Sequence, residues 1–244
     1  MAKRIVLVTG GTNGIGKATA ERFAKDGDIV IAWGVNEERI AQLDNGIIGK
    51  KVDVSNPSEV ESAVEEIVKE HGKIDVLVCA AGVVGQITTE TPYEEAQESW
   101  NELIGVNLTG TFLTAQAVAK HISRENGRIV LVSSVSAFTG SMRPGGIGYA
   151  ASKAGVNGLM LALSRELGPQ GITVNAVAPG FIGNTGITSQ FSESDIQNIV
   201  KQATVPHLGQ PEDIATAIHY LASPEAKFVN GEIHHVNGGW LPGR

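Results

Sequence analysis

Tyr149 and Lys153 are the two residues whose types and spacing most clearly indicate chemistry. They lie four residues apart at the start of an apolar stretch that is typical of a helix, so both side chains should lie on the same helix face. A phenol ionises near pH ~10, and a nearby ammonium group lowers that pKa towards neutrality. We therefore expect Tyr149 to donate or accept a proton in a reaction. The same spacing also fits an ordinary surface pair, so the rest of the chain must decide.

A glycine-rich turn follows the first apolar run of the chain. Gly10, Gly14 and Gly16 lie where a predicted strand over 5–8 meets a predicted helix over 17–25. Glycine permits a tight turn and close approach of a ligand to the backbone, and a helix N-terminus offers free N–H groups and a partial positive charge. The turn is therefore predicted to bind the pyrophosphate of a dinucleotide.

Apolar runs alternate with helical patterns along the whole chain. Strands are predicted at 5–8, 29–32, 52–54, 74–78, 128–132, 172–177 and 232–236, and helices at 17–25, near 36, and at 57–71, 96–123, 149–167 and 211–222. This alternation predicts an α/β fold, namely a doubly wound, mostly parallel seven-stranded sheet of the Rossmann type with helices on both faces. We expect a single domain over 1–244. A polar stretch at about 182–204 is expected to be a mobile substrate lid, with a plain surface excursion as the alternative.

Composition and charge exclude several classes of partner. The 244 residues are 42% hydrophobic and 18% charged, and 19 Lys+Arg against 26 Asp+Glu give a net charge of −7, which argues against nucleic acid and anionic membranes. No apolar run approaches the ~18 residues that a membrane span needs. The single cysteine, Cys79, cannot form a disulfide within the chain, which fits a reducing compartment. A cytoplasmic protein is therefore expected. His234 and His235 are strand neighbours that point to opposite faces, so no metal site is expected.

The motifs together resemble the single-domain short-chain dehydrogenase/reductase family over essentially the whole chain. The resemblance rests on Thr9-Gly10-x-x-x-Gly14-x-Gly16 and Tyr149-x-x-x-Lys153. Further residues follow in the family's order: Asp53, Asn107, Ser134, Pro179-Gly180 and Val236-Asn237-Gly238-Gly239. One departure is Cys79-Ala80-Ala81-Gly82, where the family usually has Asn-Asn-Ala-Gly.

The resemblance implies a role for each catalytic residue. Tyr149 would be the general acid in ketone reduction and the base in alcohol oxidation, while Lys153 would lower its pKa and bind the nicotinamide ribose. Ser134 would donate a hydrogen bond to the substrate oxygen, with Ser136 as the alternative serine. Asn107 would hold a water that resupplies the proton.

The resemblance also implies a cofactor site assembled from several turns of the chain. Its expected members are Gly10, Thr12, Asn13, Gly14, Ile15, Gly16, Asp53, Val54, Ala81, Gly82, Tyr149, Lys153, Pro179, Gly180, Ile182 and Thr185. Asp53 would accept a hydrogen bond from the adenine amino group. The expected cofactor is NADP or NAD. The second strand does not end in the acidic residue that selects NAD, and no basic residue directly follows it to select NADP. Lys17 and Arg39 could reach the ribose and tilt the expectation slightly towards NADP.

The expected function is an NAD(P)(H)-dependent oxidoreductase that interconverts a ketone and a secondary alcohol. A 3-oxoacyl thioester on an acyl carrier protein or coenzyme A is an alternative substrate, although the charge of −7 and the lack of a base in Gly168-Pro169-Gln170 favour a free small molecule. Arg124 and Arg128 keep carrier docking open. Rivals of other classes are a non-catalytic dinucleotide-binding sensor and a non-redox enzyme. The family's usual assembly, a homotetramer built on the long helix, the Tyr149 helix and the last strand, is also expected.

Overall fold

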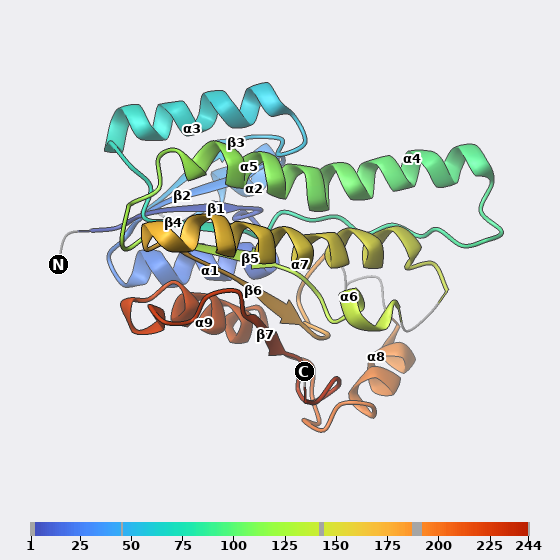
Figure 1. The fold of residues 1–244 in the computed structure, drawn as a ribbon. Coiled ribbons are helices and arrows are strands. Elements are labelled where there is room, and N and C mark those ends of the chain that lie inside the picture. Colours follow the sequence, from blue (N-terminus) through green and yellow to red (C-terminus); the bar gives the residue numbers. More distant parts are fainter. Residues whose placement is uncertain (1–2, 45, 142–143, 187–191, 244) are drawn as a thin grey trace.

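A parallel sheet runs through the centre of the computed structural model, which describes residues 3–44, 46–141, 144–186 and 192–243 (Figure 1). Within these ranges the strands are β1 (Ile5–Thr9), β2 (Ile29–Gly34), β3 (Ile47–Lys51), β4 (Val76–Cys79), β5 (Arg128–Val132), β6 (Thr173–Pro179) and β7 (Ile233–Val236). Their order is β3-β2-β1-β4-β5-β6-β7, and every neighbouring pair is parallel. This confirms the predicted fold class. The order reverses between β1 and β4, where ligands of such sheets bind.

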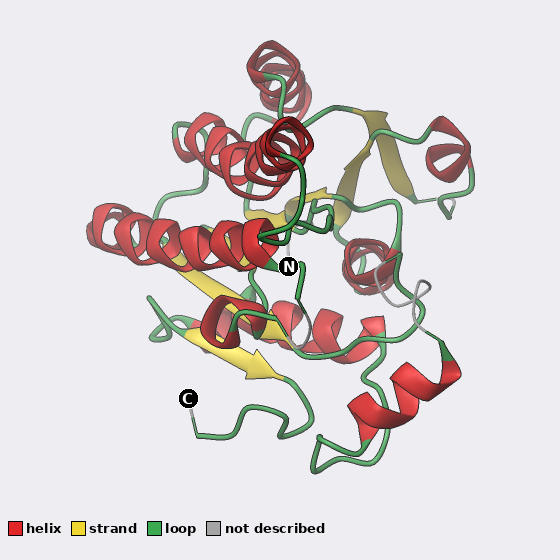
Figure 2. Cartoon of the chain, turned by 90° about the vertical axis from the view of Figure 1, so that its right-hand side faces the viewer, coloured by secondary structure: helices red, strands yellow, loops and turns green. Residues whose placement is uncertain are grey.

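Helices cover both faces of the sheet (Figures 1 and 2). They are α1 (Gly14–Lys25), α2 (Glu37–Ala41), α3 (Pro57–His71), α4 (Tyr93–Ile104), α5 (Gly110–Ala119), α6 (Ser136–Thr139), α7 (Ile147–Leu167), α8 (Glu193–Val200) and α9 (Pro211–Leu221). Alternate strand residues face opposite sides, which yields two buried apolar clusters. Leu7 and Leu77 belong to the cluster under α3, α5 and α7, whereas Val8 and Val78 belong to the cluster over α1 and α9.

The third strand differs from the prediction. It runs from Ile47 to Lys51, so Asp53 lies in the turn after the strand rather than at its end. β3 lies at the edge of the sheet, and its Lys50 and Lys51 form ion pairs with glutamates. A buried strand is recognised by an unbroken apolar run, whereas an edge strand can be polar, so this strand was not recognised. The predicted run at 52–54 instead packs Val52 and Val54 into the cluster under α3.

The long helix predicted over 96–123 is divided. It begins earlier, at Tyr93, and a π-helical turn at Gly105–Thr109 separates α4 from α5, which ends at Ala119. A Cβ added to Gly110 would lie 2.7 Å from Val54 Cγ2, so the helix packs closely on the turn after β3. Apolar periodicity does not distinguish a single wide turn from a continuous helix.

The remaining boundaries shift by a few residues. The helix that carries Tyr149 begins at Ile147, β4 and β6 extend to Cys79 and Pro179, and β7 begins at Ile233. Asn56 caps the start of α3, since its Oδ1 accepts a hydrogen bond from Ser58 N. In the part of the chain that the structure describes, no helix is long and apolar enough to cross a membrane.

Candidate active site

Tyr149, Lys153 and Ser134 come together where β5 ends beside the first turns of α7. The Lys153 ammonium group donates a 2.8 Å hydrogen bond to the carbonyl of Val132, the last residue of β5, and lies 5.9 Å from the centre of the Tyr149 ring. Ser134 bonds the phenol with its hydroxyl group and accepts a hydrogen bond from the backbone N–H of Ser136 at 3.1 Å. Of the two serines considered from the sequence, Ser134 is the one whose side chain contacts Tyr149.

The pKa values of this pair differ from the expectation. Withdrawal from water raises the pKa of the Tyr149 phenol, and the hydrogen bond to Ser134 partly offsets the rise. Burial also lowers the pKa of Lys153 to about 8. The pKa of Tyr149 therefore moves in the direction opposite to the expected one, because residue spacing does not reveal that both groups are buried. Tyr149 is neutral at neutral pH and is suited to donating a proton.

Cys79 lies close enough to Lys153 for their charges to influence each other. The thiol is 3% exposed, and burial raises its pKa to about 12, so it remains neutral at neutral pH. The substitution of the family's asparagine by Cys79 therefore places an uncharged, weakly polar group beside the lysine.

Asn107 lies fully buried in the π-helical turn and connects three segments. Its Oδ1 accepts a hydrogen bond from Val83 N at 2.8 Å, and its Nδ2 donates to Val83 O and to Ser152 Oγ, both at 3.0 Å. Ser152 in turn donates to the carbonyl of Tyr149 at 2.8 Å. Asn107 was expected to hold a water, and its side chain bonds to protein partners while its main-chain carbonyl accepts from Thr111 Oγ1.

Sequence reasoning missed Ser152. It is fully buried between Tyr149 and Lys153, where it links the π-helical turn to the catalytic helix. The only signal in the sequence was a small polar residue within an otherwise apolar helical stretch, and that signal is common to many structural serines.

The glycine turn between β1 and α1 has the geometry to hold a phosphate group. Gly10 and Gly14 have positive φ angles of 64° and 49°, which favour glycine. A Cβ on Gly10 would lie 2.7 Å from the backbone of Ala81, and one on Gly16 would lie 2.1 Å from the carbonyl oxygen of Gly10. The turn is therefore closed against β4, and α1 starts at Gly14 with no side chain capping its first N–H groups. These features fit a dinucleotide pyrophosphate.

Other predicted cofactor residues surround this turn. Gly82 lies beside the catalytic groups, since a Cβ there would be 3.3 Å from Asn107 Oδ1 and 3.5 Å from Lys153 Nζ. Thr185 contacts Gly14 from above, with its hydroxyl donating to the carbonyl of Ile182 at 3.2 Å. Asp53 is half-buried, and its Oδ1 accepts hydrogen bonds from the backbone N–H and hydroxyl of Ser55.

The remaining predicted cofactor residues lie at the ends of strands and at the start of α1. Pro179 accepts a hydrogen bond from Val135 N at 3.1 Å, and Gly180 donates to Val236 O at 2.9 Å. Thr12 is buried against Gly34, where β2 ends, and Asn13 is exposed just before α1. The other three predicted residues lie near the same strand ends: Ile15 in the first turn of α1, Val54 after β3 and Ala81 after β4.

Metal-binding side chains are not gathered at this site. Among the described residues, no group of three or more His, Cys, Asp and Glu side chains is placed to hold a metal ion.

Comparison with known proteins agrees with this geometry. A family model described as Enoyl-(Acyl carrier protein) reductase matches residues 10–241. The chain is 38% identical to the 3-oxoacyl-[acyl-carrier-protein] reductases of Thermotoga maritima and Escherichia coli, covering 97% of this chain and 97% and 96% of the relatives. It is 36% identical to a 3alpha-hydroxysteroid dehydrogenase of Mediterraneibacter gnavus, over 98% of this chain and 97% of the relative. A solved dehydrogenase/reductase from Sinorhizobium meliloti is 31% identical, with a TM-score of 0.90 over 99% of this chain and 96% of that one.

A Rossmann-type sheet that presents a closed glycine turn beside a buried Tyr-Lys pair defines a nicotinamide-dinucleotide oxidoreductase. The chain belongs to the short-chain dehydrogenase/reductase family, as its sequence resemblance predicted. It is an NAD(P)-dependent enzyme that interconverts a ketone and a secondary alcohol.

Proposed function

We propose that the protein reduces a free small ketone to a secondary alcohol and that Tyr149, Ser134, Lys153 and Asn107 form its catalytic group. The observation that carries this proposal is the hydrogen bond between Ser134 and the phenol of Tyr149 beside the glycine turn. It places two O–H donors at one point, which is where a carbonyl oxygen that gains negative charge needs them.

Each residue of the proposed catalytic group has a separate role in the reaction. The bound nicotinamide supplies a hydride to the carbonyl carbon. Tyr149 gives its proton to the carbonyl oxygen, and Ser134 stabilises the charge that develops there. Lys153, whose ammonium lies 5.9 Å from the centre of the Tyr149 ring, would bind the ribose. Asn107 holds the relay water, and its side chain joins this helix to Val83 and Ser152.

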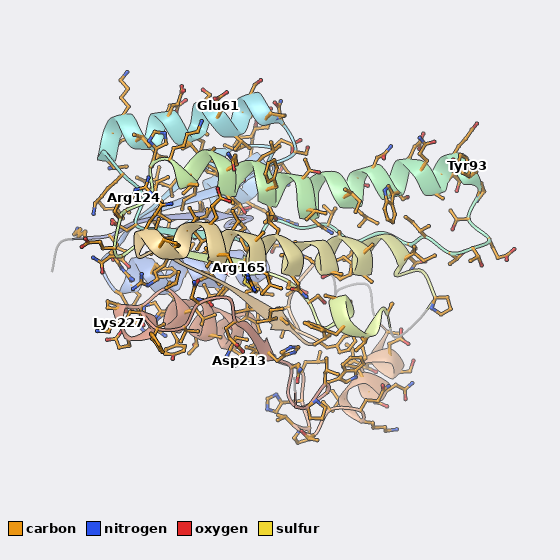
Figure 3. The ribbon with its side chains drawn as sticks, in the orientation of Figure 1. Glu61, Tyr93, Arg124, Arg165, Asp213 and Lys227 are labelled. Carbon is orange, nitrogen blue, oxygen red and sulfur yellow. The ribbon has the colours of Figure 1, made fainter. Side chains whose placement is uncertain are left out.

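The substrate is proposed to be free rather than carried on an acidic protein. Arg128 is 3% exposed and donates to the carbonyls of Gly127 and Ser223, so it does not offer a docking surface. Arg124 lies before β5, at the edge of the sheet opposite the glycine turn (Figure 3). The two arginines that kept carrier docking open therefore do not support it: Arg128 is buried, and Arg124 lies at the other end of the strands from the glycine turn.

We favour NADP over NAD as the cofactor. Gly34 ends β2 without a carboxylate, and the next polar side chain, Asn36, caps α2 by accepting from Arg39 N at 2.9 Å. Arg39 is exposed at this end of the sheet, whereas Lys17 pairs with Glu21 at 3.5 Å. A 2′-phosphate would meet no fixed acid at the end of β2 and would find the Arg39 guanidinium nearby.

The chain is further proposed to act as one domain over 1–244 and to assemble as a homotetramer. The lid predicted at about 182–204 includes α8, and residues 187–191 lie outside the described part of the structure. Support for its proposed role as a lid comes from Thr185, which contacts Gly14 of the cofactor turn.

The first experiment follows NADPH and NADH oxidation with small ketones, sugars and a 3-oxoacyl thioester. Tyr149→Phe should lower kcat/KM by about 10² to 10⁴-fold, because the general acid is lost while the ring remains. Ser134→Ala should lower it by about 10² to 10³-fold. Ser136→Ala is the matched control and should act like the wild type, because only its backbone N–H contacts Ser134. Dinucleotide Kd, measured by fluorescence, should change little in all three variants.

Two results would contradict the proposal. Normal turnover by Tyr149→Phe would remove Tyr149 from the mechanism. Thermal stabilisation by a dinucleotide without turnover of any substrate would favour the sensor, since a ligand at a hundredfold excess over Kd stabilises by about 2.7 kcal/mol whether or not it reacts.

A further inference from the structure

The chain contains several Asn-Gly pairs, a sequence in which asparagine is chemically labile. The backbone nitrogen of the glycine attacks the asparagine carboxamide, and no glycine side chain shields that nitrogen. The pairs lie at 13–14, 45–46, 126–127, 157–158, 230–231 and 237–238, and the second of them includes a residue outside the described part of the structure. Attack requires an accessible carboxamide and a peptide that can turn, so the fold decides which pair reacts.

Asn13 meets both requirements. It is exposed in the glycine turn, its backbone is extended with φ −153° and ψ 156°, and its side chain caps none of the N–H groups of α1. Gly14 is half-buried with a φ of 49°. The peptide between the two residues is held by Asn13 O, which accepts a 3.1 Å hydrogen bond from Lys17 N. Turning this peptide therefore breaks one bond at a helix terminus, where helices fray.

Two pairs near the C-terminus have carboxamides that are bonded at both ends. Asn230 Oδ1 accepts from Val174 N at 2.8 Å, and its Nδ2 donates to Ser164 O at 3.0 Å. The oxygen and nitrogen of the Asn237 side chain likewise bond to main chain, at 2.9 Å and 3.1 Å. Each carboxamide would have to lose two hydrogen bonds before it met the next backbone nitrogen.

The other two described pairs are held by the backbone of the glycine. Asn157 is 9% exposed inside α7, where the helix hydrogen bonds hold the nitrogen of Gly158. Asn126 is exposed, but Gly127 is buried, and a Cβ added there would lie 2.6 Å from Ser123 O. Among the described pairs, Asn13 therefore combines the accessible carboxamide with the peptide that turns most easily.

We propose that Asn13 is a site of spontaneous deamidation and that its modification weakens dinucleotide binding. The nitrogen of Gly14 forms a bond to Cγ of Asn13 while the bond from Cγ to Nδ2 breaks. The carboxamide nitrogen leaves as ammonia and takes up the proton that Gly14 N loses. Water then opens the ring, adding its hydroxyl group to one of the two carbonyl carbons and its proton to the nitrogen. The product is aspartate or isoaspartate at position 13, and no oxidant is consumed.

The product places a negative charge directly before α1. A carboxylate at a helix N-terminus is favourable for the free protein, because it accepts from uncapped N–H groups and complements the helix dipole. The same carboxylate competes with the phosphates of the dinucleotide for these groups and repels them. The effect on binding rests on the proposed function, in which the glycine turn holds the pyrophosphate. The fold is thus retained as the chain ages, whereas affinity for the cofactor falls.

The first test ages the protein at mildly alkaline pH and follows each Asn-Gly pair by peptide mass mapping, which detects the exchange of an amide for a carboxyl group. Asn13 should be modified before Asn126, and the pairs at 157, 230 and 237 should stay intact. Bound NADPH should slow the reaction at Asn13 and leave that at Asn126 unchanged. Modification of Asn126 at the same rate as Asn13, or before it, would overturn the site.

The second test separates the modification from its effect on the cofactor. Asn13→Asp supplies one product directly and should raise the Kd for NADPH by about tenfold, with no loss of thermal stability in the absence of nucleotide. Asn13→Gln should keep its starting affinity on ageing, because the longer side chain closes a ring much more slowly. Asn126→Gln is the matched control and should lose affinity as fast as the wild type.

The two parts of the proposal fail differently. If Asn13 is modified first but Asn13→Asp binds NADPH normally, the effect on binding is overturned, and so is the placement of the pyrophosphate in the glycine turn. If Asn13→Asp binds weakly but Asn13 stays intact on ageing, the deamidation is overturned and the proposed cofactor site stands.

Discussion

At the scale of single residues, the site combines a lysine and a tyrosine that both lose water on folding. Lys153 is 4% exposed, its ammonium donates a hydrogen bond to the carbonyl of Val132, and no carboxylate among the described residues pairs with it. Burying a charge with so little compensation is costly, which is why the pKa of Lys153 falls to about 8. The protein therefore carries a group with a proposed role in the reaction at the expense of stability.

We expect Lys153→Met to stabilise the nucleotide-free protein while abolishing turnover. A fall in pKa from 10.5 to about 8 corresponds to roughly 3 kcal/mol, part of which is offset by the lost bond to Val132, so a gain of about 1 to 3 kcal/mol is expected at pH 7. The folded pKa is the lower one, so the wild type carries the full cost below pH 8 and recovers it as pH rises towards 10.5. Urea unfolding at several pH values measures this. A variant whose advantage grew between pH 8 and 10 would contradict it.

The Tyr149 and Lys153 pair was predictable from type and spacing, but its electrostatics were not. Spacing places two side chains on one helix face and says nothing about the strand that covers them. The end of β5 both buries Lys153 and supplies its hydrogen-bond partner, Val132. Ser152 was missed for the same reason, since its partner Asn107 lies 45 residues away in the sequence.

At the scale of elements, the π-helical turn determines where the catalytic helix lies. Asn107 in this turn bonds Val83 after β4 and, through Ser152, the carbonyl of Tyr149. The strands and helices were predictable because apolar alternation is a local signal. The wide turn was not, because apolar periodicity is the same in a single wide turn and in a continuous helix. The strand β3 was misplaced because an edge strand can be polar.

We expect Ser152→Ala to reduce kcat by roughly tenfold through misplacement of Tyr149, with dinucleotide Kd unchanged. Ser164→Ala is a matched control on the same helix, because Ser164 is also buried and its hydroxyl also donates to a carbonyl three residues earlier, at 2.8 Å. The control should lose stability without a change in kcat. Equal effects of the two substitutions on kcat would show that Ser152 is only a structural serine.

At the scale of the whole molecule, apolar side chains remain exposed on the outer face of α4, α5 and α7. Trp100, Phe112, Leu161 and Ile147 are 40% to 48% exposed there. Covering this surface is the basis of the proposed tetramer. Native mass measurement should find four chains, and Phe112→Glu with Leu161→Glu should yield smaller species. Ile48→Glu, on β3 and 46% exposed, is the control and should leave the assembly intact. A wild-type monomer at micromolar concentration would contradict the proposal.

The order of strands also governs how the chain acquires its structure during synthesis. β1 lies in the middle of the sheet, and one of its neighbours, β4, follows only at Val76–Cys79. A nascent chain that has emerged as far as α3 has a completed side from β1 to β3. On the other side β1 exposes an edge of four apolar residues followed by Thr9. Such an edge pairs readily with other chains. The same central position that brings the glycine turn to the dinucleotide therefore makes the half-made protein prone to aggregation until β4 covers that edge.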